Sequence, residues 1–344
     1  MGEQIQDHQK KACELYYTNV YAQSFSPCGK YLAAGNNYGQ IAVFSIVAAL
    51  SPDATKASWT PVFSFKAQED SVFSMVSTDT LLICAGSAGQ VLAWKWADIL
   101  NKAPKVVWSL SVPRGNSFTE PEINSLVLSS EDGVTRLYAG CGDNNVYIWD
   151  MESGTLLSQL KGHEDYIHCV CVKGEGLESQ CVSASEDGTI RLWDIRAGRE
   201  ATHVIEPYKN ELCARPEFGR WLGCVAVDPS ADWLICGGGP KLSAWHLRSL
   251  SSTTVFDTPG ACQQHVMFYE DTIISGGSEP RINHWFVNGD VKAQVPCRPT
   301  SVFNIVINTE SQNHKVLSVA GCSPKLDVCT NFGYTAFSLT FAST

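Results

Sequence analysis

The sequence predicts an all-β fold, a seven-bladed β-propeller built as one domain. Three observations support this prediction. A complete repeat unit runs from Gly162 to Asp194, a weaker marker of the unit recurs along the chain, and the 344 residues can supply seven blades of about 45 residues each. We expect the propeller to span residues 19–344 and an N-terminal segment to span residues 1–18.

The complete unit reads GHEDYIHCV, a short connection, and then CVSASEDGTIRLWD. Its Gly-His pair precedes its Trp-Asp pair by about 30 residues, as in one four-stranded blade. Asp187–Gly188 provides the tight turn between two strands. These residues resemble the WD40 repeat family, which implies that a hydrogen-bonded tetrad of His163, Ser183, Asp187 and Trp193 ties the blade together. A catalytic triad is the alternative interpretation of the His-Ser-Asp set, but the repeat spacing already explains each member.

The recurring marker is a small-residue and glycine step followed, eight or nine residues later, by an aromatic residue. Each copy follows an apolar run with the alternation of a half-buried strand. The copies are Ala34-Gly35 to Phe44, Ala85-Gly86 to Trp94, Ala139-Gly140 to Trp149, Ala184 to Trp193, Gly237 to Trp245, Gly277 to Trp285, and Ala320-Gly321 to Val328 or Cys329. Seven copies predict seven blades, and six or eight would require a miscounted marker.

The two ends of the chain leave two solutions for closing the ring. Tyr334–Phe341 (YTAFSLTF) alternates like a strand and could be the outer strand of the last blade, or the N-terminal segment could supply that strand. In the N-terminal segment, Ile5, Ala12, Leu15 and Tyr16 fall near one helical face. We therefore expect a short amphipathic helix that docks on the propeller.

Acidic residues are concentrated in the third and fourth blades. Between Thr119 and Ile190 there are thirteen acidic residues against three basic ones, which accounts for the net charge of −10 of the whole chain. Those that the repeat does not require include Glu164, Asp165, Glu175 and Glu178. An acidic sector attracts basic partners and repels phosphate backbones. A solvated face without a partner is an equally good interpretation.

A second candidate partner surface lies in the insertion Glu206–Arg220 (EPYKNELCARPEFGR). This insertion brings Tyr208, Arg215, Phe218 and Arg220 together just before Trp221. Aromatic and arginine residues dominate the energetics of protein interfaces. Burial in the core is an equally good interpretation of Trp221.

Two further long insertions are candidate contact segments because repeat proteins project insertions from a binding face. They are Ile46–Ser58 and Ala97–Pro121.

Several catalytic and cofactor sites are disfavoured by spacing. Gly237–Pro240 (GGGP) could suggest a phosphate-binding loop, but such a loop needs Lys-Ser/Thr opening a helix, and here a strand follows. The fourteen cysteines include no CxxC pair, and Cys169 and Cys171 point to opposite faces of one strand. We expect most cysteines, including Cys84 and Cys181, to be small buried hydrophobic residues. The chain is expected to be non-catalytic and to bind no cofactor or metal.

Composition disfavours two other classes of protein. The acidic balance, without a basic stripe, argues against direct binding of nucleic acid. Met1–Lys11 lacks the apolar core of a signal peptide, and no run approaches 18 apolar residues. We therefore expect no membrane association.

Longer segments carry a more specific resemblance than the repeat alone. The most specific are Gly219–Cys224 (GRWLGC) and Thr330–Phe341 (TNFGYTAFSLTF). The others are Ser26–Phe44, Gly162–Cys169, Cys236–Ser249 and Lys292–Pro296. Together these segments resemble the THO complex subunit 6 family, the WD-repeat proteins of the transcription-export machinery.

This resemblance implies a non-catalytic scaffold subunit that supports mRNP assembly, mRNA processing and nuclear mRNA export through protein–protein contacts. Its partners would be other THO subunits, coiled-coil ones among them. RNA would be contacted only indirectly, and the complex would assemble into higher oligomers. Because Lys10-Lys11 is too short for a nuclear localisation signal, partners would carry the chain into the nucleus.

Two other functions stay open at this point. The WDxR form of Trp193–Arg196 is associated with substrate-receptor adaptors of cullin-type ubiquitin ligases, although a salt bridge of Arg196 on the blade rim is the favoured interpretation. The other function is a module that reads basic peptides, such as histone tails, through the central channel. The acidic sector supports that second function.

Overall fold

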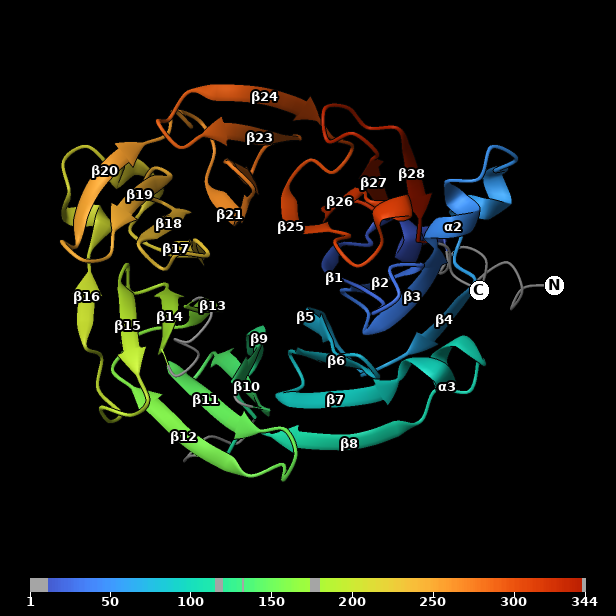
Figure 1. Cartoon of the computed structure of the whole chain (residues 1–344), viewed down its shortest axis with the longest axis horizontal. Coiled ribbons are helices and arrows are strands. Elements are labelled where there is room, and N and C mark those ends of the chain that lie inside the picture. Colours follow the sequence, from blue (N-terminus) through green and yellow to red (C-terminus); the bar gives the residue numbers. More distant parts are fainter. Residues whose placement is uncertain (1–11, 115–119, 132, 174–179, 342–344) are drawn as a thin grey trace.

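The computed structural model describes residues 12–114, 120–131, 133–173 and 180–341. Within these ranges, 28 strands form seven four-stranded antiparallel sheets around a central channel (Figure 1). Each sheet contains four strands that are consecutive in the sequence, running from the channel to the rim. The prediction of a seven-bladed propeller is confirmed.

The blades are described from the channel outward. The innermost strands are β1 (Val20–Phe25), β5 (Val72–Ser77), β9 (Ile123–Glu131), β13 (Ile167–Val172), β17 (Leu222–Val227), β21 (Gln263–Tyr269) and β25 (Val302–Ile307). The second strands are β2 (Tyr31–Asn36), β6 (Leu81–Gly86), β10 (Val134–Cys141), β14 (Gln180–Ser185), β18 (Trp233–Gly238), β22 (Thr272–Gly277) and β26 (Leu317–Gly321). The third strands are β3 (Gln40–Ser45), β7 (Gln90–Lys95), β11 (Asn145–Asp150), β15 (Ile190–Asp194), β19 (Ser243–His246), β23 (Arg281–Phe286) and β27 (Lys325–Cys329). The outermost strands are β4 (Phe63–Lys66), β8 (Val106–Ser111), β12 (Leu156–Lys161), β16 (His203–Ile205), β20 (Ser251–Val255), β24 (Val291–Pro296) and β28 (Phe337–Thr340).

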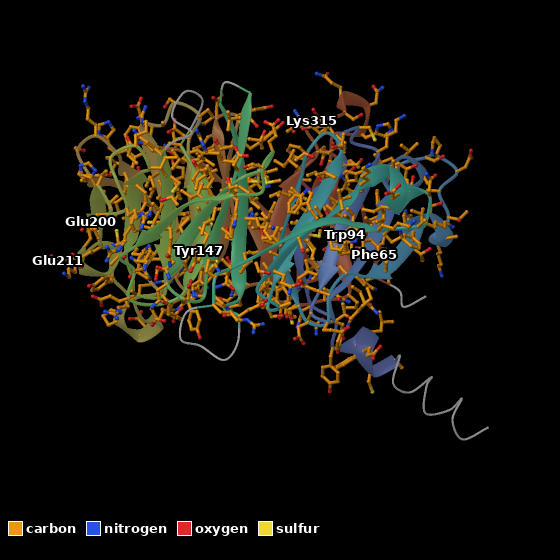
Figure 2. The ribbon with its side chains drawn as sticks, turned by 90° about the horizontal axis from the view of Figure 1, so that it is seen from below. Phe65, Trp94, Tyr147, Glu200, Glu211 and Lys315 are labelled. Atoms are coloured by element: carbon orange, nitrogen blue, oxygen red, sulfur yellow. The ribbon has the colours of Figure 1, made fainter. Side chains whose placement is uncertain are left out.

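Successive antiparallel strands place the connecting loops alternately on two faces of the disc. The proximal face carries the loops that lead into the innermost strands and the turns between second and third strands. The distal face carries the other two connections of each blade. In the edge-on view of Figure 2, Lys315, which precedes β26, lies on the opposite side from the helix formed by residues 12–16.

In the second, sixth and seventh blades, the glycine of the repeat marker is required by the backbone that enters the blade. A Cβ atom on Gly86 would overlap the carbonyl oxygen of Ser71, which lies in the loop before β5. Gly277 and Gly321 face the loops before β21 and β25 in the same way. In these three blades the loop into the blade packs against the end of its second strand, whereas Gly35 and Gly140 face side chains of the next blade, Val72 and Ile167.

Replacing Gly86 by alanine should destabilise the protein through this contact. The loop before β5 must shift to accept the methyl group, so we expect the free energy of unfolding to fall by about 1–3 kcal/mol. Chemical denaturation monitored by tryptophan fluorescence measures this change. Gly260 is the matched control because nothing lies within 4 Å of the position a Cβ would occupy. Equal stability of Gly86→Ala and Gly260→Ala would contradict this account of the marker.

The ring closes without exchanging a strand between its ends. β28 pairs with β27 as the outer strand of the last blade, and β1 pairs with β2, so the first of the two closure solutions is the correct one. Between the first and last blades, buried Gln23 donates through Nε2 to the Asn304 carbonyl oxygen (3.3 Å) and accepts from Ser318 Oγ (2.5 Å). The rings of Trp59 and Phe337 stack at 5.8 Å between centroids. Apolar residues of both blades share one core cluster across this junction.

The structure describes only the end of the expected N-terminal helix. Residues 12–16 are helical, and this segment projects from the disc (Figure 2). Within the expected apolar face, Tyr16 is 78% exposed and Leu15 is half-buried, while Ile5 lies outside the described residues. The segment is tied to the first blade by Asn37, whose Nδ2 donates to the Tyr17 carbonyl oxygen (3.2 Å).

The insertions fall on both faces of the disc. The first two contain the short helices α2 (Ile46–Ala49) and α3 (Trp96–Leu100), which follow β3 and β7 on the distal side of the rim (Figure 1). Single-turn 3-10 helices cover Lys56–Trp59, Pro207–Lys209, Pro216–Phe218 and Gln312–His314. The Glu206–Arg220 insertion leads into β17, so it lies on the proximal face. Among the described residues, no helix is long and apolar enough to cross a bilayer.

Candidate interaction surface

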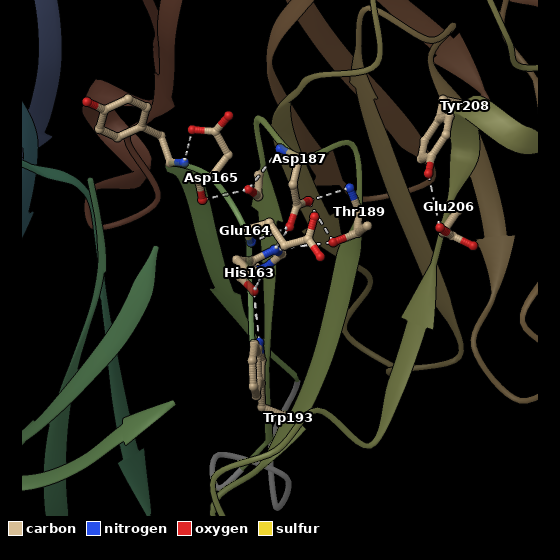
Figure 3. Close-up of polar contacts among 11 residues, drawn as sticks. His163, Glu164, Asp165, Asp187, Thr189, Trp193, Glu206 and Tyr208 are labelled. Carbon is tan, nitrogen blue, oxygen red and sulfur yellow. Dashed lines mark hydrogen bonds and ion pairs between the residues drawn. The ribbon is translucent and has the colours of Figure 1, made fainter. Parts of the chain in front are cut away.

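The four residues of the complete repeat form one hydrogen-bonded network inside the fourth blade (Figure 3). His163 Nδ1 lies 2.8 Å from Asp187 Oδ2, and His163 Nε2 lies 2.7 Å from Ser183 Oγ. Trp193 Nε1 donates to the same Ser183 oxygen at 2.8 Å. Asp187 Oδ1 also accepts from the backbone and hydroxyl of Thr189. This network connects the loop before β13 with β14, β15 and the turn between them.

Burial and hydrogen bonding determine the charges in this network. Burial lowers the pKa of His163, so the imidazole is neutral at pH 7. Burial acts to raise the pKa of Asp187, but hydrogen bonds from His163, from the backbone N–H of Glu164 and from Thr189 hold it well below its usual range. The Ser183 side chain is completely buried. A substrate could not reach its hydroxyl, so the geometry supports a structural role for the His-Ser-Asp set.

The structure brings part of the acidic sector next to part of the Glu206–Arg220 insertion. Exposed Glu164 donates its backbone N–H to Asp187 (3.0 Å), at the turn between β14 and β15. Tyr208 and Arg220 pack over Gly188 of the same turn, and the Arg220 guanidinium lies 5.9 Å from the centre of the Tyr208 ring. These residues from two separate segments therefore form one region of the proximal face, which also includes Asp165.

The acidic residues do not form one continuous surface. In the proximal loops and turns of the third and fourth blades lie Glu120, Glu122, Asp143, Glu164, Asp165 and Glu186. Asp150, the last residue of β11, and Glu152, in the turn between β11 and β12, lie in contrast on the distal face. Glu175 and Glu178 lie outside the described residues. The sequence could not separate the two faces, because acids at both ends of the strands are close together along the chain.

Arg215 does not belong to an exposed partner surface, which corrects the sequence prediction. Its side chain is only 4% exposed. The guanidinium donates to five backbone carbonyl oxygens, which belong to Gly238, Gly239, Pro240, Thr258 and Ala261, at 2.7–3.3 Å. The Phe218 ring covers it, with 4.6 Å between Cζ and the ring centre. Arg215 thus anchors the insertion to the fifth blade and to the loop before β21.

The same contacts explain the glycine-rich turn Gly237–Pro240. This turn joins β18 to β19, as the sequence predicts. Its carbonyl oxygens point at the Arg215 guanidinium. A phosphate-binding loop presents backbone N–H groups to its ligand. This turn instead presents carbonyl oxygens to a cation, so its geometry does not suit a phosphate.

Half of the cysteines, rather than most of them, are buried core residues, and Cys13, Cys28 and Cys322 are exposed. All fourteen are free thiols, and Cys84, Cys181, Cys224 and Cys236 are buried. Burial raises the pKa of the Cys84 and Cys181 thiols, which keeps them protonated and poor ligands for metal ions. Among the described residues, no group of three or more His, Cys, Asp or Glu side chains could hold a metal ion.

Sequence reasoning missed a set of residues around the central channel. Every innermost strand contains a β-bulge directly after its first paired residue, and the residue at the bulge has no partner in the ladder. These bulge residues are Tyr21, Phe73, Asn124, His168, Gly223, Gln264 and Phe303. They line a cavity of about 430 Å³ at the proximal mouth of the channel, together with Trp221, Tyr166 and Glu122. The sequence signal that could have found them is their common position as the second residue of each innermost strand.

Comparison with known proteins agrees with this architecture and gives the family. Residues 105–150 and 154–194 match the family described as "WD domain, G-beta repeat". THO complex subunit 6 homolog of Danio rerio is 48% identical over 95% of this chain and 99% of its own length. THO complex subunit 6 of Homo sapiens is 46% identical over 96% and 95%, and that of Drosophila melanogaster is 34% identical over 94% and 90%.

The chain belongs to the THO complex subunit 6 family. In this family member, the WDxR motif forms the salt bridge of Arg196 on the blade rim that the sequence favours. Arg196 lies on the rim after β15, where Nε and Nη2 donate to the two carboxylate oxygens of Asp194 at 3.2 and 3.1 Å. The motif therefore forms an ion pair within its own blade, and its geometry does not favour the ubiquitin-ligase adaptor over the THO family function.

Proposed function

We propose that this chain is a non-catalytic scaffold subunit of a THO complex, in which it binds other subunits, coiled-coil ones among them. The observation that carries the proposal is similarity over nearly the whole length of both chains to proteins named THO complex subunit 6. In this role the chain supports mRNP assembly, mRNA processing and nuclear mRNA export through protein–protein contacts. Its nuclear localisation and its place in higher oligomers depend on those partners.

The geometry supports a role in binding rather than catalysis. A closed ring of seven blades is rigid, and loops on both faces can present separate patches to several partners. The residues that most resemble a catalytic set are buried structural ones. On the proximal face, Glu164, Asp165, Tyr208 and Arg220 combine charged and aromatic side chains of the types found in interfaces.

Affinity purification from nuclear extract tests the proposal. The tagged chain is isolated after nuclease treatment, and its partners are identified by mass spectrometry. We expect other THO subunits to be retained without RNA. Recovery of ubiquitin-ligase scaffold proteins, with no THO subunit, would instead support the adaptor function and contradict the proposal.

Charge reversal tests whether the proximal acidic residues contribute to this binding. We expect Glu164→Lys combined with Asp165→Lys to reduce recovery of at least one THO subunit by about tenfold or more, because repulsion replaces attraction at the contact. The matched control is Asp53→Lys combined with Glu152→Lys, two exposed carboxylates on the distal face. Thermal unfolding verifies that both variants are folded. Equal recovery with both double variants would place the contact elsewhere.

A further inference from the structure

The proximal mouth of the channel is lined by side chains that belong to none of the hydrophobic core clusters. A β-bulge turns a residue out of the regular alternation of its strand, and bulges often re-aim side chains at functional sites. Here all seven innermost strands use the bulge to place one residue at the same level of the channel. Asn124 and His168 have partners within the protein, Nδ2 donating to the Ile167 carbonyl oxygen (3.0 Å) and Nε2 lying 2.7 Å from Glu186 Oε2. The aromatic side chains among the seven line the cavity and can contact a ligand.

One side of the mouth is an aromatic arc contributed by the seventh, first and second blades. The Tyr21 ring lies 5.2 Å from the Phe303 ring and 5.5 Å from the Phe73 ring, measured between centroids. All three side chains are half-buried and line the cavity. Such an arc offers ring faces and edges to a ligand, with the Tyr21 hydroxyl as its only polar atom.

The opposite side is polar and is covered by an indole. Gly223 has no side chain, and the Trp221 ring lies over it, so that a Cβ on Gly223 would come within 2.8 Å of Trp221 Cζ3. Trp221 Nε1 donates to the Phe218 carbonyl oxygen (3.0 Å), which fixes the indole. The neighbouring His168 ring is 6.5 Å from Trp221. Trp221 thus closes the ring of channel-lining groups at the one bulge position without a side chain.

The charge at the mouth is negative. Glu122 lines the cavity directly, beside Tyr166. Glu186 lies behind His168, with 2.7 Å between Oε2 and Nε2. No lysine or arginine is among the described residues that line this cavity. Aromatic rings with a carboxylate and no competing lysine or arginine favour a positively charged ligand group.

We propose that the proximal mouth of the channel binds an arginine side chain presented by an extended segment of a partner protein. A guanidinium is planar and weakly hydrated, so it can stack on aromatic rings while its N–H groups reach a carboxylate. The compact, strongly hydrated ammonium of lysine fits this combination less well. Tyr21, Phe73 and Phe303 would contact the guanidinium or its aliphatic stem, and Glu122 would accept its hydrogen bonds. This site goes beyond the scaffold function and does not depend on which protein supplies the segment.

Fluorine NMR of the isolated chain tests the proposal. The ten tryptophans are labelled as 5-fluorotryptophan, and the Trp221 resonance is assigned with Trp221→Phe. The probe is the peptide acetyl-Gly-Gly-Arg-Gly-Gly-amide, with citrulline and lysine versions alongside. We expect the arginine peptide to shift the Trp221 resonance saturably, and the uncharged citrulline peptide to bind about tenfold or more weakly.

Variants distinguish this site from a nonspecific charge effect. Glu122→Gln should weaken binding of the arginine peptide about fivefold or more, and Phe73→Leu should weaken it without changing the net charge. Glu270→Gln, on the distal face, should leave it unchanged. Equal binding of the lysine peptide would overturn the assignment to arginine. Absence of a saturable shift, or equal binding of the citrulline peptide, would overturn the site itself.

Discussion

Replacing Arg215 by methionine should lower the free energy of unfolding by about 3–5 kcal/mol. Methionine keeps most of the apolar stem but removes the donors to five backbone carbonyl oxygens. Burial lowers the pKa of Arg215, as expected for a cation held away from water. Removing the charge recovers part of that desolvation cost, so the loss is smaller than five independent hydrogen bonds would suggest. Urea denaturation measures the effect.

Two variants show whether the contacts of Arg215 cause this loss. Arg215→Lys should fall between the wild type and Arg215→Met, because an ammonium has three donors instead of five. Arg248→Met, at an exposed position, should change stability by less than about 0.5 kcal/mol. Limited proteolysis should also cut the Glu206–Arg220 insertion faster in Arg215→Met. If Arg215→Met is as stable as Arg248→Met, the guanidinium does not anchor the insertion.

Acidification should destabilise the propeller through its buried histidines. Burial lowers the pKa of His265 to about 4, and its Nδ1 is buried without a hydrogen-bond partner. The unfolded chain takes up this proton near pH 6.5, whereas the folded protein takes it up only near pH 4. The contribution to stability is therefore complete above pH 6.5 and is lost progressively as the pH falls to 4. It amounts to about 3 kcal/mol.

The variant His265→Gln isolates this contribution. Unfolding free energies at pH 7.5, 5.5 and 4.5 should fall less steeply for His265→Gln than for the wild type. Some slope should remain, because burial also lowers the pKa of His163 and His284, with the same sign. His203→Gln changes an exposed histidine and should keep the slope of the wild type. Identical slopes for His265→Gln and the wild type would contradict a protonation cost at His265.

The blades could be predicted because their requirements are local. A small-residue and glycine step, followed in most blades by an aromatic residue eight or nine positions later, recurs along the chain, so each blade leaves its own marker. The tetrad is similarly encoded within one repeat, and its hydrogen bonds join residues at most 24 positions apart. Ring closure depended on which end supplied the last strand, which no local pattern specifies.

The surface was harder to predict because it depends on distant parts of the chain. Arg215 stands among aromatic and charged residues that suggest an interface, yet its partners Thr258 and Ala261 follow it by 43 and 46 residues. The bulge residues alternate in their strands as solvent-facing positions would. Only the closed ring shows that Tyr21 and Phe303, 282 positions apart in the sequence, lie side by side. The hydrophobic pattern predicts the innermost strands one by one. The channel mouth forms only when the ring closes and brings these strands together.

The most direct test of the account is sedimentation velocity of purified proteins without RNA. The chain is mixed with a recombinant THO complex that lacks its own subunit 6, after nuclease treatment of all components. The account predicts that the chain sediments with the complex in a fixed stoichiometry. If it remains at the sedimentation coefficient of the free chain, it is not a directly bound scaffold subunit, and the proposed function is wrong.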